Sequence, residues 1–540
     1  MNELIVGGQY NIGHICTRQQ CDAGRGDKVA MRWIDHAMQR ADYTFADIEA
    51  ESNRCANLLA NLGLSVGDVA FTFLPKMPEQ FFFFLGALKF QLICGTLFSN
   101  FGEEALLDRL GDAGAKAVLT KKSLARRILK VRGQMPELKH LILVDTDEHT
   151  SDTLSLKKLM QEASTSFDVP DTGAETPSVL HYTSGSTGKP KGALHCHRSV
   201  LMQSFTAKEV LQLSPEEIYW CTADQGWVTG TSYGIIGPWS LGVTQVHFGG
   251  VYDPAHWMQL IQEQGITIWY TAPTALRMLM REPADLYSGY DLSSLKHIFS
   301  VGEPLNPEVI SWGEKVLGKT IYDTWFQTET GAIMITNRPG VEVRPGSMGV
   351  PVPGIEPAIL ADDGKEVATG EHGNLCLRSG WPSMFKVYLN AQEKYDSRFR
   401  DGYYYTGDTA WRDRDGYVWF VGRSDDVINT SGHLVSPFEV ESALLEIKEI
   451  AESGIIGAPD DLLFEKVVAF VALHSGVEWN EELELKIRLY ISNKVSSIAC
   501  PHEIIVVEKI PKNKSGKIMR RVLKARYMGA DEGDISTMED

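Results

Sequence analysis

The sequence predicts an α/β protein with a large N-terminal domain, built from parallel-sheet α/β subdomains and a small β-rich subdomain, and a small α/β C-terminal domain. From residue 69 to beyond 265, apolar runs of strand length alternate with helical patterns, which is typical of βαβ units and parallel sheets. Between 345 and 421 short strands alternate with turns, which indicates the β-rich subdomain. At 422–426 a strand ends in a polar run before a new strand and helix begin.

Individual elements follow from the hydrophobic pattern. Residues 69–74 and 117–120 are apolar and rich in β-formers, so we expect strands there, and 104–113 shows the spacing of an amphipathic helix. The most apolar stretch, 81–98, contains a lysine, a glutamine and two glycines. A buried helix followed by a strand is therefore favoured over a membrane span.

The polar run gives the domain boundary. We expect an N-terminal domain over 1–424, carrying the nucleotide and acyl sites, and a C-terminal domain over 425–540. A helix near the start of the second domain is announced by Ser436, Pro437 and Glu439, which form an N-cap, a first-turn proline and the third position of a capping box.

Composition excludes several classes of function. The 540 residues are 43% hydrophobic and carry a net charge of −18, with a pI of about 5.3. A chain of this length can bury several cores, and its acidity argues against a nucleic-acid or anionic-membrane binder. The N-terminus lacks the features of a signal peptide. We expect a cytoplasmic enzyme with neither a targeting segment nor a membrane span.

Cysteine and histidine positions give no metal pattern. The eight cysteines form no Cys-x-x-Cys pair, so we expect reduced, mostly buried thiols. His195, His197 and His433 have no accompanying ligand pattern, and neutral structural histidines are the preferred interpretation. We predict no transition-metal site.

A glycine-rich segment predicts a phosphate-binding site. Its glycines, hydroxyl side chains and lysines offer backbone N–H groups, O–H donors and positive charge to phosphate oxygens. A Walker loop ends in Gly-Lys followed by Ser or Thr, whereas Lys189 is followed by Pro190, so an ordinary P-loop ATPase is disfavoured. The segment comprises Thr183, Ser184, Gly185, Ser186, Thr187, Gly188 and Lys189, followed by Pro190-Lys191-Gly192.

A second lysine-rich segment lies near the C-terminus, where Lys514-Ser515-Gly516-Lys517 is surrounded by further basic residues. Charge alone favours a solvated basic tail. The two segments together closely resemble the signatures of the adenylate-forming superfamily, which includes acyl-CoA synthetases, luciferases and peptide-synthetase adenylation domains. The resemblance covers nearly the whole chain and implies a mobile C-terminal lid that rotates about Asp425. It also implies that Lys517 is the catalytic cation.

The same resemblance assigns the nucleotide site. It implies that Gly302, Glu303 and Pro304 and the ring of Trp325 sandwich adenine, that Thr328 touches the α-phosphate and that Glu329 helps to hold Mg²⁺. Asp408 would accept hydrogen bonds from the ribose hydroxyls, with Arg423 supporting that region. A flat ring suits stacking, and a hard carboxylate suits Mg²⁺. The remaining residues of the implied ATP site are Asp323, Thr324, Phe326 and Gln327.

Three segments carry a closer resemblance within the superfamily: Trp227-Val228-Thr229-Gly230, residues 300–304 and Asp323-Thr324-Trp325. They most closely resemble the acetyl-CoA synthetases. The resemblance implies an acyl pocket of Trp227, Val228, Thr229, Val301 and Phe326, where the family usually has a second Trp at the last position. Phe in place of this Trp removes part of the pocket floor. A pocket distinguishes two acids that differ by one methylene by only about 1–3 kcal/mol of free energy. Acetate is the preferred acid, and propionate or another short- or medium-chain acid is the alternative.

The implied reaction is AMP-forming. Acid and ATP give an acyl-adenylate and pyrophosphate, and CoA then displaces AMP with Thr229, Ser431 and Gly432 beside the pantetheine. The implied substrates are therefore ATP, CoA and a short-chain carboxylate, and the reaction can run in either direction. Leu434 and Ser492 stand where the family usually has Arg, so we expect Arg126, Arg127 or Lys494 to supply the missing contacts.

Other functions are weighed against this one. A peptide-synthetase adenylation domain should be followed by a carrier domain. A luciferase needs a larger acyl pocket than the one implied here. A catalytically silent nucleotide sensor is favoured only by Leu434. The presence of Lys517 and Glu329 favours an active enzyme over the silent sensor. We also expect a lysine acetyltransferase and deacetylase to act on Lys517, because acetylation removes the needed charge.

Overall fold

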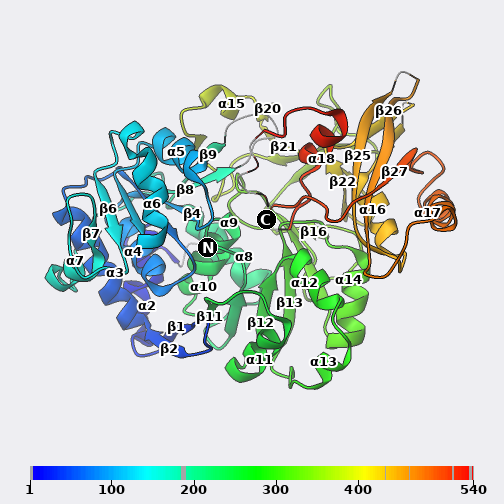
Figure 1. The fold of residues 1–540 in the computed structure, drawn as a ribbon. Coiled ribbons are helices and arrows are strands. Elements are labelled where there is room, and N and C mark those ends of the chain that lie inside the picture. The colour runs from blue at the N-terminus through cyan, green and yellow to red at the C-terminus, as the bar shows by residue number, and fades with distance from the viewer. Residues whose placement is uncertain are drawn as a thin grey trace.

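The computed structural model describes residues 4–183, 190–431, 433–460, 462–513, 516–533, 535 and 538. Within these residues there are four β-sheets with helices packed around them (Figure 1). The predicted α/β fold, with a large N-terminal domain and a small C-terminal one, is confirmed. Two large sheets form the body, a small sheet shares a hydrophobic core with both of them, and the fourth sheet belongs to the C-terminal domain (Figure 1).

The first large sheet has eight strands in the order β19-β9-β8-β4-β3-β5-β6-β7, and neighbours from β8 to β7 are parallel. All six residues of β3 are buried, as expected for a central parallel strand. The predicted strands at 69–74 and 117–120, and the helix followed by a strand at 81–98, are confirmed. The strands are β3 (Val69–Leu74), β4 (Ile93–Phe98), β5 (Ala117–Thr120), β6 (His140–Leu143), β7 (Leu154–Ser155), β8 (Pro177–Thr183), β9 (Lys191–Cys196) and β19 (Val387–Tyr388).

Helices of the first third of the chain accompany this sheet. α3 begins with a capping box, in which Thr44 and Asp47 satisfy each other's backbone N–H groups. The predicted helix at 104–113 is present as α5, shifted by one residue. The helices are α1 (Ile12–Cys16), α2 (Arg18–Gln20), α3 (Phe45–Asn61), α4 (Pro78–Lys89), α5 (Glu103–Asp112), α6 (Lys122–Val131) and α7 (Leu156–Glu162).

The second large sheet has nine strands in the order β16-β15-β14-β13-β12-β10-β11-β1-β2, and is parallel from β14 to β1. Its strands are β1 (Val29–Ile34), β2 (Arg40–Thr44), β10 (Ile218–Cys221), β11 (Thr244–Phe248), β12 (Ile268–Thr271), β13 (His297–Val301), β14 (Ile321–Trp325), β15 (Ile335–Thr336) and β16 (Val350–Pro351). Its helices are α8 (Ser199–Glu209), α9 (Val228–Thr231), α10 (Gly237–Ser240), α11 (Pro254–Gln264), α12 (Pro273–Met280), α13 (Asp285–Ser288) and α14 (Pro307–Trp312).

The predicted β-rich subdomain is the third sheet, which is antiparallel throughout. Its longest strand, β21, pairs with three others and carries Asp408 opposite Arg423 of β22. The elements are β17 (Pro357–Leu360), β18 (Gly373–Arg378), α15 (Gln392–Asp396), β20 (Phe399–Arg400), β21 (Tyr403–Arg412) and β22 (Val418–Arg423).

The C-terminal domain has its own five-stranded sheet. Ser436 caps α16 by accepting from the Glu439 N–H at 3.2 Å, as the sequence predicts. The chain leaves the third sheet at Arg423 and enters this one at Ile428, on either side of the predicted boundary. The elements are β23 (Ile428–Thr430), β24 (His433–Val435), α16 (Pro437–Leu445), β25 (Ile450–Asp460), β26 (Phe464–Leu473), α17 (Glu481–Lys494), β27 (Glu503–Val506) and α18 (Arg520–Met528).

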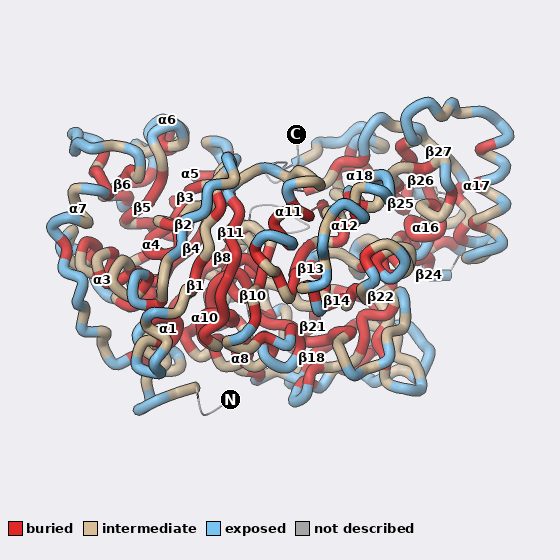
Figure 2. The backbone as a smooth tube through the Cα atoms, turned by 90° about the horizontal axis from the view of Figure 1, so that it is seen from below, coloured by how far each residue is buried: buried red, intermediate tan, exposed pale blue. Residues whose placement is uncertain are grey.

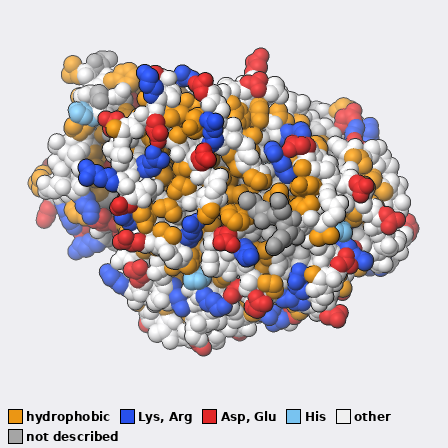
Figure 3. All heavy atoms as spheres, turned by 180° about the vertical axis from the view of Figure 1, so that it is seen from behind, with side chains coloured by type: hydrophobic (Ala, Val, Ile, Leu, Met, Phe, Trp, Pro, Cys, Tyr) orange, Lys and Arg blue, Asp and Glu red, His pale blue; other side chains and the backbone are white. Residues whose placement is uncertain are grey.

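Burial and surface charge agree with the composition. Figure 2 shows buried residues along the strands of both large sheets and exposed ones on the outer helices and loops. On the face in Figure 3, acidic and basic side chains are interspersed. All eight cysteines are free and six are buried. None of the helices in the described part of the chain is long and apolar enough to cross a membrane.

A pair of carboxyl groups joins the two domains. Glu308, on α14 of the large domain, hydrogen-bonds Glu446, which follows α16 of the C-terminal domain. Burial, together with this neighbouring carboxylate, raises the pKa of Glu308 to about 7, while Lys494 acts in the opposite sense. Glu446 also accepts from Lys494 at 3.0 Å and from the Tyr490 hydroxyl. Glu308 therefore holds the shared proton, and Glu446 remains the anion.

This pair predicts a pH dependence of stability. Because the pKa of Glu308 is raised from 4.5 to about 7, its contribution is fully present below pH 4.5 and is lost as the pH rises to about 7. Glu308→Gln keeps a donor toward Glu446 at every pH. We expect the variant to gain thermal stability relative to the parent between pH 4.5 and 7, measured as the difference in Tm. Glu314→Gln, at an exposed position nearby, is the control; a constant Tm difference across this range would contradict the prediction.

Candidate active site

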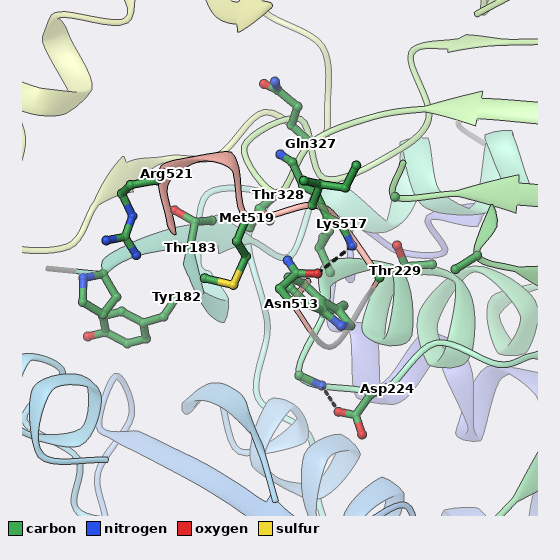
Figure 4. A pocket seen from close by; sticks show the side chains of 18 of the residues that line it. Tyr182, Thr183, Asp224, Thr229, Gln327, Thr328, Asn513, Lys517, Met519 and Arg521 are labelled. Carbon is green, nitrogen blue, oxygen red and sulfur yellow. Dashed lines mark hydrogen bonds between the residues drawn. The ribbon is translucent and has the colours of Figure 1, made fainter. Parts of the chain in front are cut away.

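A cavity of about 1730 Å³ lies between the large domain and the C-terminal domain (Figure 4). The large domain contributes the end of β8, the start of α9, the end of β13 and the loop after β14, and the C-terminal domain contributes the segment before α18. Thirteen residues that the sequence assigns to a site line this cavity. They are Thr183, Trp227, Val228, Thr229, Val301, Gly302, Phe326, Gln327, Thr328, Glu329, Arg423, Asp425 and Lys517.

Other predicted residues are placed differently. Ser431 is exposed at the turn between β23 and β24, away from the cavity lining. The predicted phosphate-binding residues Ser184, Gly185, Ser186, Thr187, Gly188 and Lys189, and the predicted CoA residue Gly432, lie outside the described residues. The residues that sit next to the lining rather than in it are Glu303, Pro304, Asp323, Thr324, Trp325 and Asp408.

The predicted phosphate loop connects two paired strands at the cavity. Thr183 ends β8, and Lys191 begins β9 directly opposite it in the antiparallel register. Lys191 lines the cavity, and its ammonium lies 5.2 Å from the centre of the Tyr388 ring. Burial and the nearby Arg398 lower its pKa, whereas Glu329 acts in the opposite sense. The two strand ends on either side of residues 184–189 therefore both lie at the cavity.

Asp408 is a buried acceptor, with a relative exposure of 3%. Its Oδ1 accepts from an Arg423 N–H at 2.9 Å, and its Oδ2 accepts from Trp325 Nε1 at 3.2 Å and Gln327 Nε2 at 3.1 Å. Gln327 is itself held by the Tyr404 hydroxyl at 3.0 Å. The network joins the predicted ribose and adenine residues into one unit, which the sequence motifs alone do not reveal.

The loop that carries Glu329 is fixed from both sides. The Tyr388 hydroxyl donates to Glu329 Oε1 at 2.6 Å, and burial together with Glu329 raises the pKa of this tyrosine. His195 Nε2 contacts the Thr328 carbonyl oxygen at 2.8 Å. Burial lowers the pKa of His195 to about 4, so the ring is neutral near pH 7. This histidine therefore supports the site through the backbone of Thr328.

Asp323 has a buried carboxyl oxygen without a protein partner among the described residues. Its relative exposure is 7%, and burial raises its pKa well above the usual value, against hydrogen bonds from two backbone N–H groups. An unpaired buried acceptor costs free energy unless a ligand or water supplies a donor.

Lys517 reaches the cavity on a short hairpin. Its backbone N–H donates to Asn513 Oδ1 at 2.9 Å (Figure 4). Its carbonyl accepts from the Asn513 N–H at 2.9 Å. The side chain lines the cavity and is exposed to it. Burial lowers the pKa of Lys517, as does the neighbouring Arg423, while Asp408 and Asp426 act in the opposite sense. Asn513 was missed from the sequence because its role depends on this hairpin.

The predicted acyl residues lie around the start of α9. Trp227 is the N-cap residue, with its ring 4.8 Å from that of Phe98, and Val228 and Thr229 form the first turn. Phe326 packs edge-on against Tyr233 at 5.4 Å. The Tyr233 hydroxyl accepts from the Ile333 N–H at 2.7 Å, which fixes the ring beneath Phe326.

The positions that depart from the family pattern lie elsewhere. Leu434 is 47% exposed on β24, and Ser492 lies on α17; neither lines the cavity. Arg127 does line it and donates to the carbonyls of Ser99 and Phe101. Lys494 is engaged with Glu446 at 3.0 Å.

Comparison with known proteins decides the family. The AMP-binding enzyme model matches residues 17–389, and the model of the AMP-binding enzyme C-terminal domain matches 439–517. The acetyl-coenzyme A synthetase of Bacillus subtilis (strain 168) is 46% identical over 536 residues, covering 99% of this chain and 93% of that protein. The chain belongs to the acetyl-CoA synthetase family of AMP-binding enzymes. The predicted family and the predicted AMP-forming ligase class are confirmed.

Further relatives agree with this assignment. The acetyl-coenzyme A synthetase of Pyrobaculum aerophilum is 36% identical, covering 99% of this chain and 86% of that protein. The crystal structure of the anthranilate CoA ligase AuaEII with anthranoyl-AMP is similar with a TM-score of 0.89 and 29% identity, covering 97% and 98% of the two chains. The Brucella canis acyl-CoA synthetase structure has a TM-score of 0.76 at 32% identity, covering 98% and 96%.

Proposed function

We propose that this acetyl-CoA synthetase family member joins acetate, in preference to longer acids, to CoA with conversion of ATP to AMP and pyrophosphate. The observation that carries the proposal is the common cavity of Lys517, Glu329 and Val228, since these are a cation, a carboxylate and an apolar wall. Such a cavity suits an acid with a short apolar tail, a triphosphate and a site of developing negative charge between them.

ATP is proposed to lie with its phosphates at Thr183 and the segment 184–189, and with its α-phosphate at Thr328. The buried free oxygen of Asp323 suits the amino group of adenine, next to Trp325 and the 302–304 segment. Asp408 and Arg423 would hold the ribose end. Glu329 would hold Mg²⁺, because its carboxylate faces the cavity and is a hard oxygen ligand. The bound ion would neutralise phosphate charge.

In the first half-reaction a carboxylate oxygen of the acid attacks the α-phosphorus, and the bond to pyrophosphate breaks. Negative charge accumulates on the phosphoryl oxygens, and Lys517 stabilises it. Its position in the cavity between the domains lets the ammonium approach these oxygens directly. The acyl-adenylate then lies beside Val228 and Thr229.

In the second half-reaction the C-terminal domain acts as a lid that turns about Asp425, withdrawing Lys517 and bringing Ser431 and Gly432 beside the pantetheine. The CoA thiolate attacks the acyl carbon, and AMP leaves with the electron pair of the broken bond. The exposed position of Ser431 in this structure fits the first half-reaction. The thioester and the ATP linkage have similar energies, so pyrophosphate removal would set the direction.

We also propose that Lys517 is a target for a lysine acetyltransferase and deacetylase in the cytoplasm. Acetylation would remove the charge that the first half-reaction requires. The free state of all eight cysteines fits a reducing compartment.

We expect the side chain at position 326 to affect the preference for acetate over propionate. We expect Phe326→Trp to fill part of the pocket floor and to raise the acetate-to-propionate ratio of kcat/KM by about tenfold, within the range for one methylene. Steady-state kinetics with both acids measures this ratio. Phe399→Trp, outside the cavity lining, is the control, and an unchanged ratio in Phe326→Trp would remove Phe326 from the pocket.

The experiment that tests the function is ATP–pyrophosphate exchange with acetate, propionate, butyrate, hexanoate and benzoate, followed by CoA-dependent AMP release. Exchange that peaks with acetate, together with CoA turnover, is the expected result. A maximum with a larger acid would contradict the pocket assignment. Absence of exchange with every acid would favour the nucleotide sensor.

A further inference from the structure

The C-terminal domain contacts the large domain at both ends of α12. At the start of this helix, Thr274 Oγ1 lies 3.2 Å from the carbonyl oxygen of Gly516, the residue before Lys517. Immediately after the helix, Arg281 donates to the Ala451 carbonyl at 2.8 Å and lies 3.3 Å from Glu452. Figure 1 shows α12 in the large domain next to the C-terminal domain.

The contact at Gly516 leaves no room for a side chain. A Cβ added there would lie 2.0 Å from Thr274 Oγ1 and 2.7 Å from Glu303 Oε1, and the φ of +86° also requires glycine. The receiving surface is held in place, because Arg277 donates to Thr274 Oγ1 at 2.7 Å and to Glu303 Oε2 at 2.5 Å. The backbone beside Lys517 therefore rests on a fixed surface of the large domain.

The contact at Arg281 reaches the base of the same hairpin. Glu452 accepts from Lys512 Nζ at 2.9 Å and from the Ile510 N–H at 3.3 Å. Burial would raise the pKa of Glu452, but Lys512 and the Ile510 N–H hold it below its usual value, so the carboxylate stays charged. The Lys512 side chain is only 11% exposed. Arg281 is thus linked through Glu452 to the residues from which the Lys517 hairpin rises.

A third contact runs through Arg277. Its second N–H donates to Asn306 Oδ1 at 3.0 Å, which directs the Asn306 amide nitrogen to Ser442 Oγ of α16 at 2.8 Å. Both Asn306 and Ser442 are buried. Three separate segments of the C-terminal domain, near residues 442, 452 and 516, are therefore positioned by one helix and its neighbours.

We propose that α12 is a docking platform that sets the position of Lys517 for adenylate formation, with Thr274 and Arg281 as positioning residues. The inference rests on the proposed function, in which Lys517 acts only in the first half-reaction. The platform contacts exist while Lys517 is in the cavity and must break when the domain turns. They therefore matter for adenylate formation and not for thioester formation.

The test measures the two half-reactions separately in the full-length protein. Acetate-dependent ATP–pyrophosphate exchange reports the first, and acetyl-CoA formation from supplied acetyl-adenylate and CoA reports the second. We expect Thr274→Val to lower exchange about tenfold or more, because small misplacement of a catalytic group can cost on the order of 10²-fold. Arg281→Ala should lower exchange about threefold, since an exposed ion pair contributes little. The second half-reaction should change by less than about twofold in both variants.

Controls make the result specific. Arg281→Lys should recover most of the exchange rate, and Arg18→Ala, which removes an exposed ion pair with Asp22, should have no effect. Thr320→Val serves as the matched threonine control. Unchanged exchange in Thr274→Val, or an equal fall in both half-reactions, would overturn the platform. Failure of the unsubstituted protein in both assays would instead contradict the proposed function.

Discussion

Lys517→Ala is expected to lower the rate of acetyl-adenylate formation by about 10² to 10⁴-fold, the range for removal of a positioned charge from a developing anion. The expectation follows from the position of Lys517 in the lining of the cavity, near Asp408 and Asp426. ATP–pyrophosphate exchange measures this loss. Acetyl-CoA formation from supplied acetyl-adenylate should be retained, because Lys517 is withdrawn in that step.

The control for this variant comes from the same basic segment. Arg526→Ala removes a half-exposed cation that pairs with Glu532 at 3.0 Å, and exchange should be unaffected. Equal losses in Arg526→Ala and Lys517→Ala would favour the solvated basic tail. Full exchange in Lys517→Ala would remove its catalytic role and, with it, the reason to expect regulation by acetylation.

Asp408→Asn is expected to raise the KM for ATP and to destabilise the protein. The substitution removes the nearer of the two carboxylates that pair with the Arg423 guanidinium, leaving Asp425 at 3.7 Å, and it disturbs the Trp325 and Gln327 donors. Breaking a buried pair by neutralising one partner costs about 3 kcal/mol of the free energy of unfolding. Loss of a charge-assisted hydrogen bond to ribose should raise KM by about tenfold. Denaturant unfolding and steady-state kinetics measure the two effects.

Asp413→Asn separates the two effects. Asp413 also accepts from an arginine, Arg344 at 2.6 Å, and from a tryptophan, Trp419 at 3.2 Å, but it does not line the cavity. This variant should lose stability without a change in the KM for ATP. A normal KM in Asp408→Asn, with stability lost, would make Asp408 a structural residue.

Much of the fold could be predicted from the sequence, because the patterns that indicate its helices and strands are local. The apolar runs at β3 and β5, and the Ser436 cap of α16, each depend on a few consecutive residues. Lys517 was singled out because its segment resembles a family signature, and its catalytic role stays a prediction. Its placement in one cavity with Val228 could not be read from spacing alone, because it depends on how the two domains pack.

The parts that the sequence did not reveal are contacts between distant segments. Thr274 and Gly516 are 242 positions apart, and neither residue type indicates a contact on its own. Trp325 illustrates the same limit: its indole N–H is bonded to Asp408, a partner on another sheet. Its stacking on adenine stays a prediction, as do the roles of Ser431 and of the segment 184–189.

The polar character of the contacts around α12 bears on how fast the enzyme can turn over. Around α12 the two domains meet through polar contacts, such as the hydrogen bonds from Asn306 to Ser442 and from Arg281 to Ala451 and the ion pair of Arg281 with Glu452. Each contributes only about 1 kcal/mol net, because water replaces it when it breaks. The two arrangements of the domains would then differ by a few kcal/mol and exchange on the microsecond-to-millisecond scale. A tighter, more apolar interface between the domains would stabilise the first arrangement and slow the reaction of the adenylate with CoA.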